Sequence, residues 1–171
     1  MTLRRPDAHE SHDYYKLYIS QVTGDDFLST LNEAMTETVE FLRMLEPSKW
    51  DYRYEAGKWS IKEVLLHIID TERIFAYRAL RIARNDMTPI VGYEQDDYIP
   101  FVDAGNRDAD SIIQEYMAVR MATLELFRYF NDEMLDRIGT ASGRPFSPRA
   151  IGFITAGHEA HHVRVIRERY L

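Results

Sequence analysis

The chain has 171 residues, 45% of them hydrophobic and 29% charged, which is typical of a globular protein with a sizeable core and not of a disordered chain. The net charge of −7 argues against a nucleic-acid-binding protein, because that function needs clustered lysine and arginine side chains. No apolar run approaches the roughly 20 residues of a membrane span, and no apolar block follows the charged N-terminus, so we expect a cytoplasmic, single-domain protein without a membrane partner.

The N-terminal segment is polar and carries two of the six histidines. We expect residues 1–12 to be flexible, with His9 and His12 exposed to solvent, because chain ends are poorly ordered unless something holds them. The aromatic-rich stretch 14–22 predicts a short helix that lies across the domain.

Two long helices are predicted before the middle of the chain. Apolar residues recur at spacings of three and four from about 26 to 45, and Pro47 ends that helix. Ser60 and Glu63 form a capping box, in which each side chain bonds the backbone N–H of the other residue, so a second helix begins at about residue 61.

Two more helices follow a long connection. The stretch 85–106 is rich in acids, glycine and proline, and loops of that length often line a functional site. A third helix is predicted from about 108 to 130, a turn region at 139–148, and a fourth helix from Pro148 to about Arg169, with Ser147 as its N-cap. No strand pattern is present, so the expected fold is an all-α four-helix bundle with long crossover connections.

The segment Gly157–His162 concentrates half of the histidines near the C-terminus. On a helix, His158 and His162 lie one turn apart on a face that also carries apolar residues, an arrangement that can hold a metal ion. A His158–His161 pair is also geometrically possible, but His162 falls nearer the middle of the apolar face. We therefore expect His158 and His162 to be ligands and His161 to lie at a rim or an interface.

A third ligand is needed, because catalytic zinc usually has three protein ligands and one open position. The candidates in the second helix are His67, Asp70 and Glu72, since the sequence has no cysteine. From the residues alone, His67 is equally well explained as a ligand and as a hydrogen-bonded core residue. A fourth ligand from Asp70 or Glu72 would close the site and indicate a structural metal.

Two carboxylates lie near the expected site, and each needs either a hydrogen-bonding partner or a role in the chemistry. Glu72 falls on an apolar stripe, so we expect it to form an ion pair with Arg78 or Arg120, or to support a ligating imidazole. Glu159 is next to a predicted ligand and is a candidate general base, although its side chain should diverge from that of His158.

The order and spacing of several short motifs resemble those of the DinB-like family of bacterial four-helix proteins, over nearly the whole chain from about residue 14. The matching pieces are Gly57–Glu63, His67, Asp70–Arg73, Tyr77–Arg78, Pro89, Gly92–Tyr98, Gly157–His162 and Glu168–Leu171.

The resemblance implies a divalent metal ion held by three histidines, one from the second helix and two from the last. Carried over by position, the ligands are His67, His158 and His162. It also implies a homodimer. The wider superfamily includes thiol S-transferases that use low-molecular-weight thiols, and related isomerases.

These features predict a metal-dependent enzyme with Zn²⁺ or Ni²⁺ and an open coordination position for water or a thiolate. The reaction would be thiol S-transfer or hydrolysis of a small molecule. The alternative hypotheses are a metal-binding or sensing module without efficient catalysis, and a purely structural bundle whose histidines are hydrogen-bonded in the core.

Overall fold

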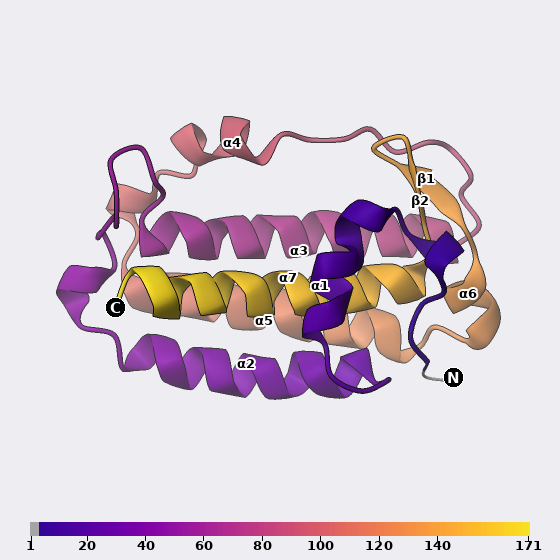
Figure 1. Cartoon of the computed structure of the whole chain (residues 1–171), viewed down its shortest axis with the longest axis horizontal. Coiled ribbons are helices and arrows are strands. Elements are labelled where there is room, and N and C mark those ends of the chain that lie inside the picture. The colour runs from indigo at the N-terminus through magenta and orange to yellow at the C-terminus, as the bar shows by residue number, and fades with distance from the viewer. Residues whose placement is uncertain (1–3) are drawn as a thin grey trace.

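The computed structural model describes residues 4–171 and confirms the expected all-α four-helix bundle with long crossover connections (Figure 1). Each long helix begins at a polar residue whose side chain accepts a hydrogen bond from a backbone N–H of the first turn, which satisfies a donor that the helix itself leaves free. The four helices, with these N-caps, are α2 (Phe27–Arg43; Asp26), α3 (Ile61–Ala83; Ser60), α5 (Ala109–Arg128; Asp108) and α7 (Pro148–Arg169; Ser147).

Shorter elements occupy the connections. The remaining α-helices are α1 (Lys16–Gln21), α4 (Gln95–Tyr98) and α6 (Asp132–Asp136). Single 3₁₀ turns span Ala8–Glu10, Asp13–Tyr15, Pro47–Lys49, Ile99–Phe101 and Ala104–Asn106. None of the described helices is both long enough and apolar enough to cross a membrane.

The prediction that the chain holds no strand is wrong at one place. β1 (Gly139–Ala141) and β2 (Arg144–Phe146) pair antiparallel within the expected turn region, with Thr140 opposite Pro145. Ser142 and Gly143 join them with φ angles of 52° and 69°, and such a two-residue turn matches the natural twist of paired strands. Strands of three residues are too short to show an alternating pattern, so the sequence could not reveal them.

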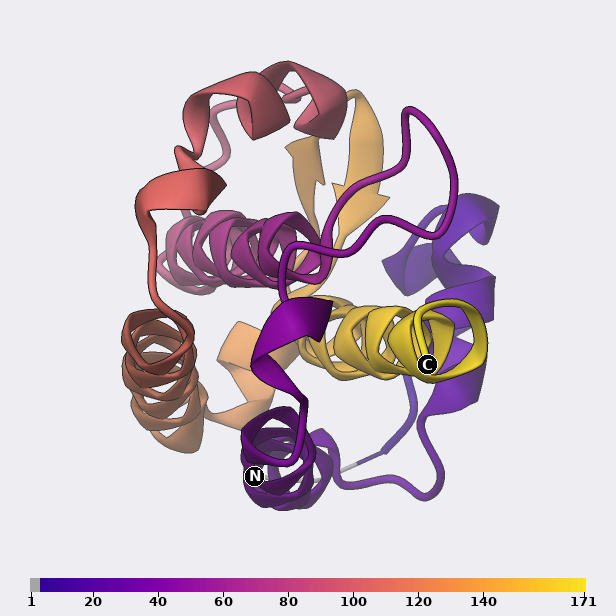
Figure 2. The same ribbon diagram turned by 90° about the vertical axis from the view of Figure 1, so that its left-hand side faces the viewer.

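The order of the helices around the bundle explains the length of the connections. α3 and α2 both pack beside α5 and α7 and lie diagonally opposite each other (Figure 2). α3 and α5 are neighbours that run in the same direction, so the chain between them must return along the length of the bundle (Figure 1). Residues 84–108 make this return and carry α4.

The N-terminal segment is docked, in contrast to the expected flexible start. The carboxylate of Glu10 is buried, where it accepts hydrogen bonds from Ser147 Oγ at 2.6 Å and from Arg149 Nη1 at 3.1 Å. This buried ion pair, which composition could not reveal, ties the segment to the start of α7. His9 and His12 are exposed as expected, and residues 1–3 lie outside the described part of the chain.

A buried ionic layer crosses the middle of the bundle. Arg120 on α5 is fully buried and binds both carboxylate oxygens of Glu72 on α3, at 2.9 and 2.7 Å, and Glu159 on α7 at 2.7 Å. It also donates to the backbone carbonyl of Leu31 on α2 at 2.9 Å. Burial alone would lower the pKa of Arg120, but Glu159 and Glu72 raise it well above its ordinary value. One guanidinium therefore holds all four long helices.

Two hydroxyl groups complete this ionic layer. Thr38 donates to Glu159 at 2.8 Å, and Tyr116 donates a short hydrogen bond to the same carboxylate. The apolar core divides into two clusters on either side of the layer, one containing Phe27, Phe75, Leu124 and Ile154 and the other Val39, Ile68, Ile113 and Ile166.

Removal of Arg120 should be strongly destabilising. We expect Arg120→Ala to lower the free energy of unfolding in urea by about 3–5 kcal/mol, because two carboxylates remain buried without their cation. The control is Arg128→Ala on the same helix, whose side chain is 60% exposed and which should change stability by less than about 0.5 kcal/mol. Equal effects of the two substitutions would contradict a central role for Arg120.

Candidate metal centre

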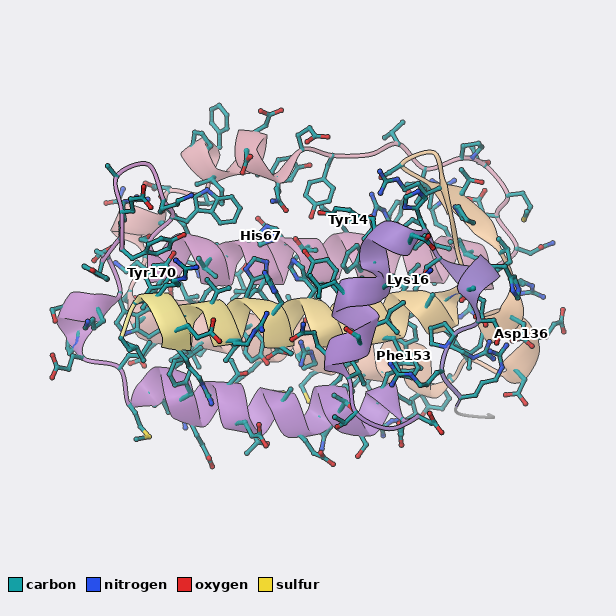
Figure 3. All side chains as sticks on the ribbon, in the orientation of Figure 1. Tyr14, Lys16, His67, Asp136, Phe153 and Tyr170 are labelled. Atoms are coloured by element: carbon teal, nitrogen blue, oxygen red, sulfur yellow. The ribbon has the colours of Figure 1, made fainter. Side chains whose placement is uncertain are left out.

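Three imidazoles meet between α3 and α7. Nε2 of His158 lies 3.0 Å from Nε2 of His67 and 3.1 Å from Nε2 of His162. His67 and His158 are buried, and His162 is half-buried. His67 lies on α3 between Tyr170 at one end of the bundle and Tyr14 towards the other (Figure 3). The structure thus brings together the three histidines expected as ligands, and His161 is not part of this group.

The spacing of these nitrogens fits a single ion. Zinc binds histidine nitrogen at about 2.0–2.1 Å, so two ligands of a tetrahedral ion lie roughly 3.3 Å apart. The two separations from His158 are close to that value, and all three donor atoms lie within 4.8 Å of one another. Among the described residues, this is the one group of three or more potential ligands whose donor atoms converge, and neither Asp70 nor Glu72 belongs to it. Three protein ligands would leave a fourth coordination position free.

The surroundings keep the imidazoles neutral, which is the form that binds a metal. Burial lowers the pKa of His67 from 6.5 to about 4. Burial and the neighbouring His67 and His161 lower the pKa of His162 to about 3. The pKa of His158 lies well below its ordinary value, first because of burial and then because of the histidines around it.

The orientation of His67 is set by its second nitrogen. Nδ1 lies 3.3 Å from the hydroxyl of Thr71, one turn further along α3, and Thr71 also shares a 2.7 Å hydrogen bond with the hydroxyl of Tyr93. When Nδ1 donates to Thr71, the lone pair of Nε2 is free to face the other two histidines. The ring of Trp59 packs against His67 with centroids 5.0 Å apart.

A second surface of the site comes from α1, which lies against α7 at a glycine. A Cβ atom on Gly157 would stand 1.8 Å from the backbone oxygen of Tyr18, so only glycine permits this contact. The ring of Tyr18 consequently lies over His158 and His161, at centroid distances of 5.4 and 5.6 Å. Burial raises the pKa of Tyr18 to about 12, so its hydroxyl stays protonated at neutral pH.

Two cavities adjoin the histidines. The larger, here called the His162 cavity, has a volume of about 880 Å³ and is lined by His161, His162, Trp59, Arg53 and Lys58, among others. The smaller, here called the Arg78 cavity, has a volume of about 430 Å³ and is lined by His158, Arg78, Tyr18, Thr71, Tyr93 and Arg144, among others. Asp96 of α4 lines both cavities, so the long connection forms part of each wall, as expected.

The carboxylates near the site have structural partners. Glu72 pairs with Arg120, which was one of the two expected arginines, and both of its oxygens are engaged there. Glu159 belongs to the same ionic layer, so the suggestion that it acts as a general base is wrong: its carboxylate accepts from Thr38, Tyr116 and Arg120 in the core. Asp70 pairs with Arg73 at the surface.

Two residues around the site were not predicted. Tyr18 and Arg78 line the Arg78 cavity, although the sequence indicated only a crossing helix for Tyr18 and an ion pair for Arg78. The one signal that could have found Tyr18 is Gly157, because a glycine inside a helix often marks a close backbone contact.

Comparisons with known proteins agree with this architecture. The model of the DinB superfamily matches residues 30–166. No curated protein matches the sequence. YfiT from Bacillus subtilis, described as a probable metal-dependent hydrolase with an unusual four-helix-bundle topology, has a TM-score of 0.71 and 17% identity, over 98% of this chain and 92% of that one.

A second solved structure has the same fold over a smaller part of its length. It is the mycothiol-dependent maleylpyruvate isomerase, with a TM-score of 0.67 and 11% identity, over 85% of this chain and 61% of that one. At these identities the two similarities concern the fold alone, and they support the bundle topology described above.

The buried histidines predict an acid-sensitive fold when no metal is bound. The unfolded chain takes up protons near pH 6.5, but folded His67 does so only near pH 4, so stability is greatest above pH 6.5 and falls between these values. Each such histidine contributes a slope of up to about 1.4 kcal/mol per pH unit.

Urea unfolding of chelator-treated protein between pH 7.5 and 4.5 measures this slope. His67→Asn should reduce it, and His9→Asn, at an exposed position, should leave it unchanged. A slope that His67→Asn does not alter would show that His67 is not buried as a neutral imidazole.

Proposed function

This chain belongs to the DinB superfamily, and on that premise we propose that it is a metal-dependent enzyme in which His67, His158 and His162 hold one divalent ion. The observation that carries the proposal is the convergence of three imidazoles beside two cavities, with the Nε2 atoms of His67 and His162 at 3.0 and 3.1 Å from Nε2 of His158. Nitrogen ligands suit both Zn²⁺ and Ni²⁺, and we propose one of these as the native metal.

Such an ion supplies positive charge that lowers the pKa of a bound water or thiol, and so yields a nucleophile at neutral pH. The protein residues supply the rest. Trp59 and Thr71 orient His67, Tyr18 covers His158, and the two cavities beside the histidines have room for a small molecule.

The His162 cavity is the proposed place of the larger reactant. Its volume of about 880 Å³ is within the range of small-molecule sites. Lys58 offers a cation at its wall that can meet a carboxylate of a low-molecular-weight thiol, whereas Arg53 is already paired with Glu63 of the same wall and Asp96 adds a negative charge. The proposed reaction is therefore either thiol S-transfer to an electrophile or hydrolysis of a small molecule. We further propose a cytoplasmic homodimer without nucleic-acid or membrane partners.

Metal content tests the proposed ligands. Protein purified without an affinity tag should contain about one Zn²⁺ or Ni²⁺ ion per chain by elemental analysis, because the three-histidine group offers a single site. His158→Ala should lose this metal, whereas His161→Ala should retain it, since His161 is not part of the converging group. Wild-type protein that neither contains nor takes up stoichiometric metal would refute the proposal and leave a structural bundle with hydrogen-bonded histidines.

Activity assays separate the two reactions. Thiols of low molecular weight are tested with 1-chloro-2,4-dinitrobenzene, and ester and amide substrates without thiol, each with the metal-loaded and the chelated protein. We expect metal-dependent turnover in one of the two series, which His162→Ala should reduce by at least about a hundredfold through loss of the metal. Full metal occupancy without turnover in either series would favour a metal-binding or sensing module.

A further inference from the structure

Arg78 stands apart from the other two fully buried arginines of the described chain. Arg120 pairs with Glu72 and Glu159, and Arg149 pairs with Glu10 and Asp136. Arg78 on α3 is only 2% exposed, yet no carboxylate among residues 4–171 forms an ion pair with it. A buried charge without a partner is costly, so the structure leaves a place for an anion that the protein does not supply.

The hydrogen bonds of Arg78 are also incomplete. Nη2 donates to the hydroxyl of Ser142 in the β1–β2 turn at 3.0 Å, but Nε is buried and has no partner within the described residues. Burial lowers the pKa of Arg78, and only the hydroxyls of Tyr15 and Tyr93 act against this effect. An anion beside the guanidinium would provide the missing acceptor and the missing charge together.

The cavity that Arg78 lines leads to the histidines. His158, Thr71 and Arg78 all border this space of about 430 Å³, which is large enough for a small molecule. Arg78 follows His67 by eleven residues on α3, about 16 Å along the helix axis, and helical side chains lean towards the N-terminal end, where His67 lies. A ligand held by Arg78 would therefore extend towards the metal ligands.

The walls favour a planar anion with one charge. The guanidinium carbon lies 5.8–5.9 Å from the ring centroids of Phe75, Tyr93 and Phe146, and the first two of these rings also line the cavity. The flat, two-pronged guanidinium matches a carboxylate, and a single buried cation balances a single negative charge. Arg144 adds a half-buried cation from β2, whereas the cavity's own acids, Glu94 and Asp96, are exposed.

We propose that the Arg78 cavity is a carboxylate-binding subsite, which holds the acid end of a small substrate while its reactive part reaches the three histidines. The link to catalysis rests on the proposed function, but the binding of the carboxylate to Arg78 does not. Tyr15 and Tyr18, whose hydroxyls burial keeps protonated, can donate further hydrogen bonds to the ligand.

Calorimetric titration with benzoate, benzamide and inorganic phosphate tests this subsite. Benzoate should bind the chelated wild-type protein, and benzamide and phosphate should bind at least about tenfold more weakly, because they lack the planar charge. Arg78→Met should lower the affinity for benzoate by about tenfold or more, and Arg78→Lys should lower it less. Arg73 is an exposed arginine of the same helix, so Arg73→Met should leave the affinity unchanged.

Folding is checked separately. Arg78→Met removes an unpaired buried charge and should melt at the same or a higher temperature than wild type. The proposal would be overturned if the wild-type protein bound benzamide as tightly as benzoate, or bound phosphate more tightly than benzoate. It would also be overturned if Arg78→Met left the affinity for benzoate unchanged, or if benzoate binding disappeared on chelation. Benzoate binding that needs Arg78 but not metal would support the subsite even if the metal-dependent function failed.

Discussion

The whole arrangement depends on one buried guanidinium. Arg120 contacts a group on each of the other three long helices, so it fixes how α2, α3 and α7 stand relative to α5. Two of its partners are close in sequence to the histidines: Glu159 directly follows His158, and Glu72 lies five residues after His67. The ion pairs therefore set the rotation of α3 and α7, and with it the direction in which their imidazoles point. Hydrophobic packing alone would constrain that rotation less, because it is non-directional.

The route of the chain supplies the cavities. Because α3 and α5 are parallel neighbours, residues 84–108 must run back along the bundle, and α4 of this return passes beside the histidines. A bundle of antiparallel neighbours with short loops would leave the same histidines more open to solvent. The arrangement separates two tasks: the long helices hold the three histidines, and the connections α1, α4 and β1–β2 provide the surfaces that a substrate of the proposed site would meet.

The sequence was informative where local chemistry decides the structure. N-cap residues and apolar periodicity predicted the four long helices, and the one-turn spacing of His158 and His162 placed these side chains on the buried face of α7. His67 could be associated with them only through a family resemblance, because no local pattern reports a contact between residues 91 positions apart.

Long-range partners could not be inferred from the sequence in the same way. Nothing local to Glu72 distinguishes Arg78 from Arg120, and the choice depends on which helix α3 faces. Conversely, Arg78 is informative only once the structure shows that no carboxylate within residues 4–171 forms an ion pair with it. The distance along the chain between His67 and the two histidines of α7 also sets an order in time. During synthesis, His67 leaves the ribosome long before the pair on α7. If the three histidines hold a metal ion, as proposed, all three can do so only after the last long helix has docked, and metal uptake would then report that folding is complete.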